Sequence, residues 1–249
     1  LINYYLEIFQ NKYLIYQITR REFVTAYTQS ILGILYHAFV PIVQTIVFNF
    51  FLNKIDFNPD DKVPTFLFIF IGLTIWNLFF NNSLRVSNIF LTNRKYLGKL
   101  YFYRFSLVIS SMIINCTHFL INFIILICII LYFKINLSLG SLTLDYKLLF
   151  VPLIVFITAI FSSGIGLIIC SLSVRYRDLL FGLNFIFQLL MFVSPVLFSL
   201  DTINETLSLI FLLNPITSFL ELFRWVFISD YMINLTFIWI NISFIFIIF

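Results

Sequence analysis

Six stretches of this chain are free of Asp, Glu, Lys and Arg, and each is long enough to cross a lipid bilayer. A bilayer core about 30 Å thick requires roughly 20 apolar residues in a helix. The stretches contain 31, 22, 29, 27, 22 and 19 residues, at 23–53, 63–84, 105–133, 148–174, 179–200 and 231–249. We therefore expect six transmembrane helices.

The composition also places the chain in a membrane. Its 249 residues are 61% hydrophobic and 10% charged, with a mean hydropathy of +1.04, whereas soluble domains have about 25% charged residues. We expect one all-α, polytopic transmembrane domain over 1–249, with no soluble domain at either end. Cys116, Cys128 and Cys170 lie in apolar runs without CxxC spacing, which favours packing residues over a disulfide framework or a zinc site.

Two further segments are expected to be helical without spanning the membrane. Residues 1–22 place apolar and aromatic side chains at helical spacing, which predicts an amphipathic interface helix on the membrane surface. A helix packed on a soluble partner would show the same pattern. The charge-free run 206–220 has 15 residues and contains Asn214-Pro215, so it predicts re-entrant or surface helices.

Basic residues are divided unequally between the two sides of the predicted bundle. With the N-terminus inside, ten Lys and Arg lie on the cytoplasmic side and five outside, which favours both termini in the cytoplasm. Loop 85–104 is then cytoplasmic, and it carries five basic residues and no acid. This loop could anchor to anionic lipid headgroups or dock as a helix into a groove of a cytosolic partner.

Several kinds of chemistry have no motif in the sequence. It contains no G-x-x-x-x-G-K-[ST] loop for ATP, no HExxH and no Cys–His cluster. His37 and His118 stand alone in apolar runs, and each is expected to be a packed helix contact. No Asp or Glu lies within the six runs, which argues against ion-driven transport. A pore, a scaffold or a transporter powered by another subunit fits these features.

The predicted spans offer aromatic and neutral polar side chains instead. Two helical stripes carry them, Phe181, Phe185, Gln188 and Phe192 in the fifth run and Gln29, Gly33, His37 and Gln44 in the first. Aromatic faces with scattered hydrogen-bonding groups suit a sugar chain, because its C–H faces stack on rings. Packing against lipid or against neighbouring helices accounts for the same residues.

Four motifs, spread over nearly the whole chain, carry a family resemblance. They are Arg21-Glu22-Phe23 with Tyr27, Ser30, Leu32, Gly33 and Pro41; Ser173-Val174-Arg175-Tyr176-Arg177-Asp178-Leu179; Ser194-Pro195-Val196; and Leu213-Asn214-Pro215-Ile216-Thr217 with Glu221, Phe223 and Arg224. In this order and with six spans, they resemble the permease subunit of type-2 ABC exporters. The resemblance is to the branch that exports O-antigen, capsule and teichoic acid polysaccharides.

The resemblance implies a homodimer that binds two copies of a separate ATPase, in the cytoplasmic (inner) membrane of a bacterium. ATP and Mg would belong to that partner, and this chain would hold no cofactor, metal or catalytic residue. The substrate would be a polysaccharide on a polyprenyl-diphosphate lipid. The implied functional residues are Asn88, Arg94, Lys95, Leu97 and Lys99 for ATPase coupling; Arg175, Tyr176, Arg177 and Asp178 at the cytoplasmic mouth; Tyr36, Gln44, Phe181, Phe185, Gln188 and Phe192 along the channel; and Pro195, Asn214, Pro215, Glu221 and Arg224 in gate helices over 202–228.

Alternatives to polysaccharide export remain at this point. A permease of the same architecture could export a small molecule such as a drug or antibiotic. A membrane scaffold could instead recruit polymer-synthesis enzymes without transporting anything. Arg175 and Arg177 would fix the cytoplasmic mouth of an exporter. Alternatively, they reflect only the general enrichment of basic residues in cytoplasmic loops. The modest net charge of +4 gives no reason to expect a nucleic-acid partner.

Overall fold

The computed structural model describes residues 12–28, 33, 35–55, 57–60, 63–93, 104–137, 142, 144–176, 178–200, 211, 214–229 and 231. The elements within these ranges are α2 (Lys12–Tyr27), α3 (Leu35–Lys54), α4 (Thr65–Ser87), α5 (Ile89–Thr92), α7 (Phe105–Leu137), a 3-10 helix η1 (Tyr146–Phe150), α8 (Val151–Ser173), α9 (Asp178–Phe192) and α11 (Ile216–Phe227). The described residues form no β-strand and a single isolated bridge, Leu142 to Ile228. For this part of the chain the all-α prediction is confirmed.

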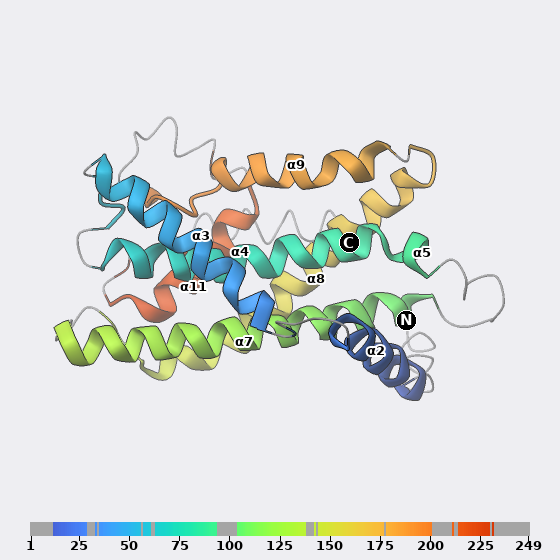
Figure 1. Ribbon diagram of the computed structural model, residues 1–249, viewed down its shortest axis with the longest axis horizontal. Helices are drawn as coiled ribbons and strands as arrows, with labels where there is room; N and C mark the ends of the chain where they lie inside the picture. The colour runs from blue at the N-terminus through green and yellow to red at the C-terminus, as the bar shows by residue number, and fades with distance from the viewer. Residues whose placement is uncertain are drawn as a thin grey trace.

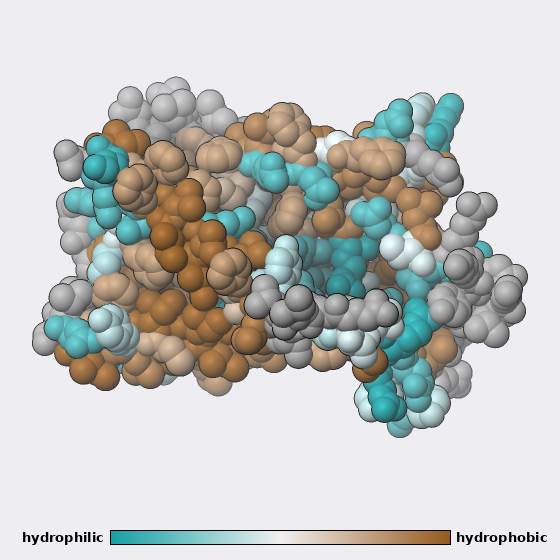
Figure 2. All heavy atoms as spheres, viewed as in Figure 1, coloured by the Kyte–Doolittle hydropathy of each residue, from teal (hydrophilic) through white to brown (hydrophobic). Residues whose placement is uncertain are grey.

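The helices form an elongated bundle with α4 at its centre (Figure 1). Helix α4 packs against α3, α7, α8, α9 and α11. Its residues from Leu67 to Phe79 are almost all buried, because the segment is apolar around its whole circumference. At one end of the bundle lie α2, α5 and the turn between α8 and α9, and we name this the α5 end. Figure 2 shows hydrophilic residues concentrated at that end and hydrophobic surface over the other half of the same face.

Four helical segments among the described residues are long and apolar enough to cross a membrane. They are Leu35–Lys54, Thr65–Ser87, Phe105–Asn136 and Tyr146–Ser173. The last three coincide closely with the predicted spans 63–84, 105–133 and 148–174. Apart from Tyr231, the predicted last span 231–249 lies outside the described residues, so the total of six spans stays a prediction.

The first predicted span, 23–53, is divided between two helices. Residues 23–27 complete α2, and α3 begins only at Leu35. Between the helices Gly33 has φ +50°, a left-handed conformation that glycine adopts without the penalty of a Cβ. The boundary at residue 22 between interface helix and span is therefore too early. Of the predicted interface helix 1–22, residues 1–11 lie outside the described residues, and its amphipathic membrane contact stays a prediction.

Helix α9 is shorter than the predicted fifth span, 179–200. It has 15 residues and ends at Phe192, and turns occupy residues 193–196. Pro195 explains this end, because proline removes a backbone donor and disfavours helical geometry at the residue before it. The Ser194 hydroxyl still donates back to Leu190 O at 2.7 Å.

A buried amide network joins the three central helices. Asn82 of α4 is fully buried, and its Nδ2 donates to Ala159 O at 2.9 Å and to Ser162 Oγ at 2.6 Å, both on α8. Its Oδ1 accepts from Asn115 Nδ2 of α7 at 3.2 Å. Polar side chains between membrane helices pair in this way because lipid offers no alternative partner.

Replacement of Asn82 by alanine should destabilise the bundle by about 1–3 kcal/mol, because it leaves buried partners unpaired. Thermal unfolding of the purified protein in detergent measures this change. Asn184→Ala on the exposed side of α9 is the matched control and should have little effect. Equal unfolding temperatures for the two variants would contradict the role assigned to Asn82.

Candidate functional site

A polar cavity lies between α3, α4 and α7, halfway along the bundle. Its volume is about 210 Å³, and we name it the inner cavity. Asn77 lies ten residues before Ser87, so at 1.5 Å per residue the cavity is about 15 Å from that end of α4. The polar residues that line it are Tyr36, His37 and Gln44 of α3, Asn77 and Asn81 of α4, and Asn115, His118 and Asn122 of α7.

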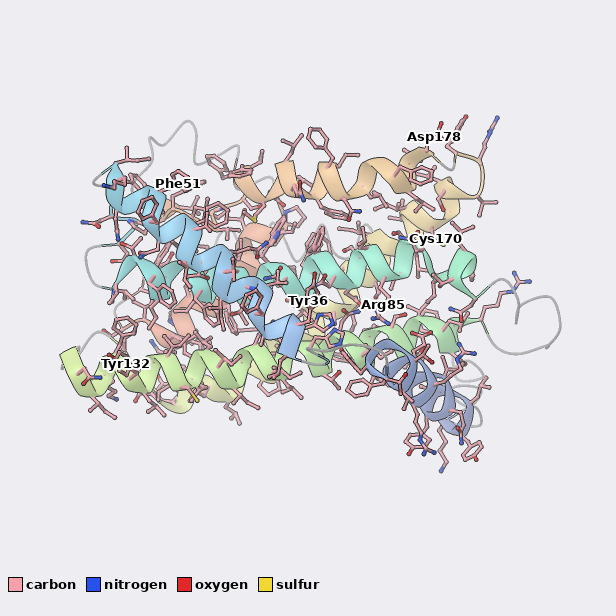
Figure 3. The ribbon with its side chains drawn as sticks, viewed as in Figure 1. Tyr36, Phe51, Arg85, Tyr132, Cys170 and Asp178 are labelled. Carbon is pink, nitrogen blue, oxygen red and sulfur yellow. The ribbon has the colours of Figure 1, made fainter. Side chains whose placement is uncertain are left out.

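A second, larger cavity of about 740 Å³ continues from the inner cavity toward the α5 end, and we name it the outer cavity. The two share His37, Asn81, Asn115 and His118 as lining residues. Figure 2 shows a hydrophilic hollow near the middle of the face, beside the start of α3. In Figure 3, Tyr36 lies midway along the bundle and Arg85 lies closer to the α5 end. The two cavities therefore form one polar route into the bundle.

Among the described residues, charged side chains line the outer cavity but not the inner one. Arg85 Nη1 of α4 pairs with Glu22 Oε2 of α2 at 3.1 Å, and the two side chains are 32% and 20% exposed. Arg21 Nη2 donates to Asn93 Oδ1 at 3.1 Å, just beyond α5. These contacts hold α2 against α4 and α5 at the α5 end. Partial exposure limits an ion pair of this kind to about 0–1 kcal/mol, so it positions α2 more than it stabilises the fold.

Three rings from three helices meet where the cavities join. The rings of His37 and His118 stack with centroids 3.7 Å apart, and the Tyr27 hydroxyl hydrogen-bonds His118 Nε2. Burial raises the pKa of the Tyr27 hydroxyl, an effect that the charge of Arg85 partly offsets, so the phenol keeps its proton. The hydroxyl either donates to His118 Nε2, with the imidazole hydrogen on Nδ1, or accepts from Nε2–H, according to the histidine tautomer. Sequence analysis treated the two histidines as separate packing residues and missed this pairing, because they are 81 positions apart.

The predicted gate residues are brought together around a buried arginine. Arg224 of α11 has an exposed fraction of 0%, and its Nη2 donates to Val196 O at 2.8 Å. Its Nη1 pairs with Glu221 Oε1 at 3.2 Å, and its guanidinium lies 3.9 Å from the centroid of the Phe68 ring of α4. Beside this group, Asn214 Nδ2 donates to Ser194 Oγ at 2.8 Å. The turn containing Pro195 is thus held by Asn214, just before α11, and by Arg224 in the last turn of α11. Pro215 immediately precedes α11.

The predicted mouth and coupling residues lie at the α5 end. Arg175 and Tyr176 are exposed in the turn after α8, and the Arg175 guanidinium lies 5.5 Å from the Tyr176 ring. Asp178 is exposed at the first residue of α9 (Figure 3). Asn88 caps α4, and its Nδ2 donates to Leu84 O at 3.0 Å. The other residues of these two groups lie outside the described residues: Arg94, Lys95, Leu97, Lys99 and Arg177.

The predicted channel residues divide into two groups. Tyr36 and Gln44 line the inner cavity. Phe181, Phe185, Gln188 and Phe192 share the exposed face of α9, opposite the buried Leu183, Phe187 and Met191. These four residues thus form one exposed stripe of α9, and their role in a channel stays a prediction.

Comparison with known families identifies the chain. The family model described as ABC-2 type transporter matches residues 13–228, which is most of the chain. The chain belongs to the ABC-2 type transporter family. A comparison with curated proteins gave no match. As an ABC-2 permease, the protein is a multi-pass membrane subunit of an ABC exporter that works with an ATP-binding partner subunit.

Proposed function

We propose that this ABC-2 permease moves lipid-linked polysaccharide, of the O-antigen, capsule or teichoic acid type, across the cytoplasmic membrane of a bacterium. Two copies of the chain and two copies of the ATPase form the exporter, and ATP and Mg bind to the ATPase. In this exporter, the α5 end and both chain termini face the cytoplasm. The basic residues at that end, among them Arg21, Arg85 and Arg175, support this orientation through the positive-inside rule.

The open aromatic face of α9 carries the proposal. Phe181, Phe185 and Phe192 are 84%, 64% and 56% exposed, and Gln188 is exposed among them. The ring centroids of Phe48 on α3 and Phe192 on α9 lie 6.3 Å apart. Helix α3 therefore lies beside one end of this face. A second copy of the chain facing α3 and α9 would enclose a passage lined with rings and amides. Rings stack on the C–H faces of sugars and amides bond their hydroxyls, so such a passage suits a sugar chain.

Depletion of the chain in its native cell tests the proposed function. We expect lipid-linked polymer to accumulate on the cytoplasmic side while its synthesis continues, and surface polymer to fall. Fractionation of lipid-linked glycan between the cytoplasmic face and the cell surface measures both. Unchanged surface glycan would overturn the proposal and favour a small-molecule exporter, and loss of synthesis everywhere would favour a scaffold.

A complementation experiment separates transport from scaffolding. A copy with Lys95→Glu and Lys99→Glu should fail to restore surface polymer, because the basic loop between α5 and α7 contacts the ATPase in the proposed exporter. A copy with Lys54→Glu, which alters the basic residue at the far end of α3, is the control and should restore it. Full restoration by the first copy would contradict a coupling role for the loop.

A further inference from the structure

Four buried polar atoms of the inner cavity lack a hydrogen-bond partner within the described part of the chain. They are Gln44 Oε1, Asn77 Nδ2, His118 Nδ1 and Asn122 Oδ1, and all four residues line the cavity. Asn77, His118 and Asn122 are 8%, 5% and 5% exposed. An unpaired buried polar group is destabilising, because it has lost its hydrogen bonds to water without replacing them. A cavity that gathers four of them, from three helices, is therefore suited to an occupant that forms hydrogen bonds.

The lining favours a neutral occupant. Gln44 Oε1 and Asn122 Oδ1 are acceptors, Asn77 Nδ2 is a donor, and His118 Nδ1 is a donor or an acceptor according to the tautomer. The charged Arg21, Glu22 and Arg85 line the outer cavity, and none of the described residues that line the inner cavity is charged. A buried ion without an opposite charge would be strongly disfavoured. Hydroxyl groups, which both donate and accept, match this set of atoms.

Aromatic rings complete the lining and define the shape of the occupant. Tyr36, Phe80 and Phe119 line the inner cavity beside the amides. Ligand pockets combine apolar and aromatic walls with a few placed polar groups in this way. The volume of about 210 Å³ lies below the roughly 300–1,000 Å³ of pockets that hold drug-sized ligands. It therefore accommodates one small ring rather than a polymer.

The break between α2 and α3 gives access to the site. Because α3 begins at Leu35, midway along the bundle, it does not cover the half of α4 and α7 nearest the α5 end (Figure 1). The outer cavity occupies that region and leads to the shared residues His37, Asn81, Asn115 and His118. The outer cavity thus gives a polar approach to the inner cavity from the α5 end.

We propose that the inner cavity binds a single neutral, polyhydroxylated ring, a sugar residue, which enters from the α5 end. The choice of a sugar among such rings rests on the proposed function. The site lies within one chain, so it is separate from a passage formed between two copies. A bound ring links Gln44 of α3 to Asn77 of α4 and to His118 and Asn122 of α7, and so fixes α3 against its neighbours.

Cysteine protection tests this site in the chain and its ATPase partner, reconstituted together in lipid nanodiscs. The probe variant is Asn81→Cys, made after Cys116, Cys128 and Cys170 are replaced by alanine. The rate of labelling by a small polar thiol reagent is measured with and without methyl glycosides of glucose, galactose and N-acetylglucosamine. At four times its Kd, a bound glycoside should slow labelling about fivefold by mass action. Ser171→Cys, exposed on α8, is the control and should label at an unchanged rate.

Adding Asn77→Leu and Asn122→Leu to the probe variant should abolish the protection. If this triple variant does not fold, the single change Gln44→Leu on α3 is added to the probe variant instead and should also abolish the protection. Labelling of the probe variant that no glycoside slows would show that the cavity holds water only and would overturn the proposal. Protection by inorganic phosphate, protection that survives the leucine substitutions, or a probe variant that does not label at all would overturn it too. The labelling test uses free glycosides, so it does not depend on export. Unchanged surface glycan after depletion of the chain would therefore refute polysaccharide export without refuting sugar binding in the inner cavity.

Discussion

Replacement of Arg224 by alanine is expected to lower the unfolding temperature of the purified protein by about 10 °C. Removing one partner of a buried pair costs about 3–5 kcal/mol, because the other partner stays buried without compensation. Arg224 is fully buried and holds Val196 O, Glu221 and the Phe68 ring at one junction. Glu221 Oε2 also accepts from the Tyr231 hydroxyl at 2.7 Å, so the loss extends beyond α11. Thermal unfolding in detergent measures the shift.

Two further variants sharpen this test. Arg175→Ala removes an exposed arginine at the α5 end and should leave the unfolding temperature within about 2 °C of wild type, since exposed charges contribute little. Arg224→Met with Glu221→Gln removes both charges and should recover part of the stability lost in Arg224→Ala. If Arg224→Ala unfolded at the same temperature as Arg175→Ala, the junction would not be structural.

Replacement of Gly166 by alanine is expected to destabilise the bundle by about 1–3 kcal/mol through overpacking between α4 and α8. A Cβ at this position would lie 2.7 Å from Val86 Cβ and 2.9 Å from Ser83 O. The second atom belongs to the backbone of α4, so the helices themselves must separate. Chemical or thermal unfolding of the purified protein measures the effect.

Gly182→Ala is the matched control for Gly166→Ala. A Cβ at Gly182 would meet Ile186 Cδ1 at 4.0 Å, an ordinary contact and the nearest among the described residues. This variant should be neutral or slightly stabilising, because alanine favours a helix by up to about 1 kcal/mol over glycine. Val86→Ala should rescue Gly166→Ala only in part, because it keeps the Cβ and leaves Ser83 O in place. Equal stability of the two alanine variants would contradict close packing at Gly166.

The central spans were predictable from charge alone. Each of α4, α7 and α8 coincides with a run bounded by basic residues, because charged groups are costly inside the hydrocarbon core. Helices α4 and α7 extend a few residues beyond these limits, past Arg85 and Lys134. Long basic side chains can place their charge in water from such positions. The end of α9 was also predictable, because Pro195 follows its last residue closely.

Features that depend on tertiary contacts were not predictable. The break at Gly33 requires a left-handed backbone that many glycines never adopt. Arg224 was counted among the basic residues of the outer side, yet it is buried, because its partners come from Val196, 28 positions earlier, and from Phe68 of α4. The stacking of His37 on His118 likewise arises only when α3 and α7 come together. The sequence therefore indicated the predicted gate residues one by one, and Tyr36, His37 and Gln44 of the inner cavity, but not the amides of α4 and α7 that face them.

The shortness of α9 has a consequence for the surrounding lipid. Its 15 residues extend about 22 Å, whereas the hydrocarbon core is about 30 Å thick. Helix α7, on the opposite side of the bundle in Figure 1, has 33 residues and extends about 50 Å. A helix as short as α9 is accommodated in a bilayer by local thinning, by flanking side chains that reach the interface or by oligomerisation, each at a fraction of a kcal/mol per Å of mismatch. Where the bilayer thins beside α9, a polar headgroup that crosses there travels a shorter distance through hydrocarbon than one in undisturbed bilayer.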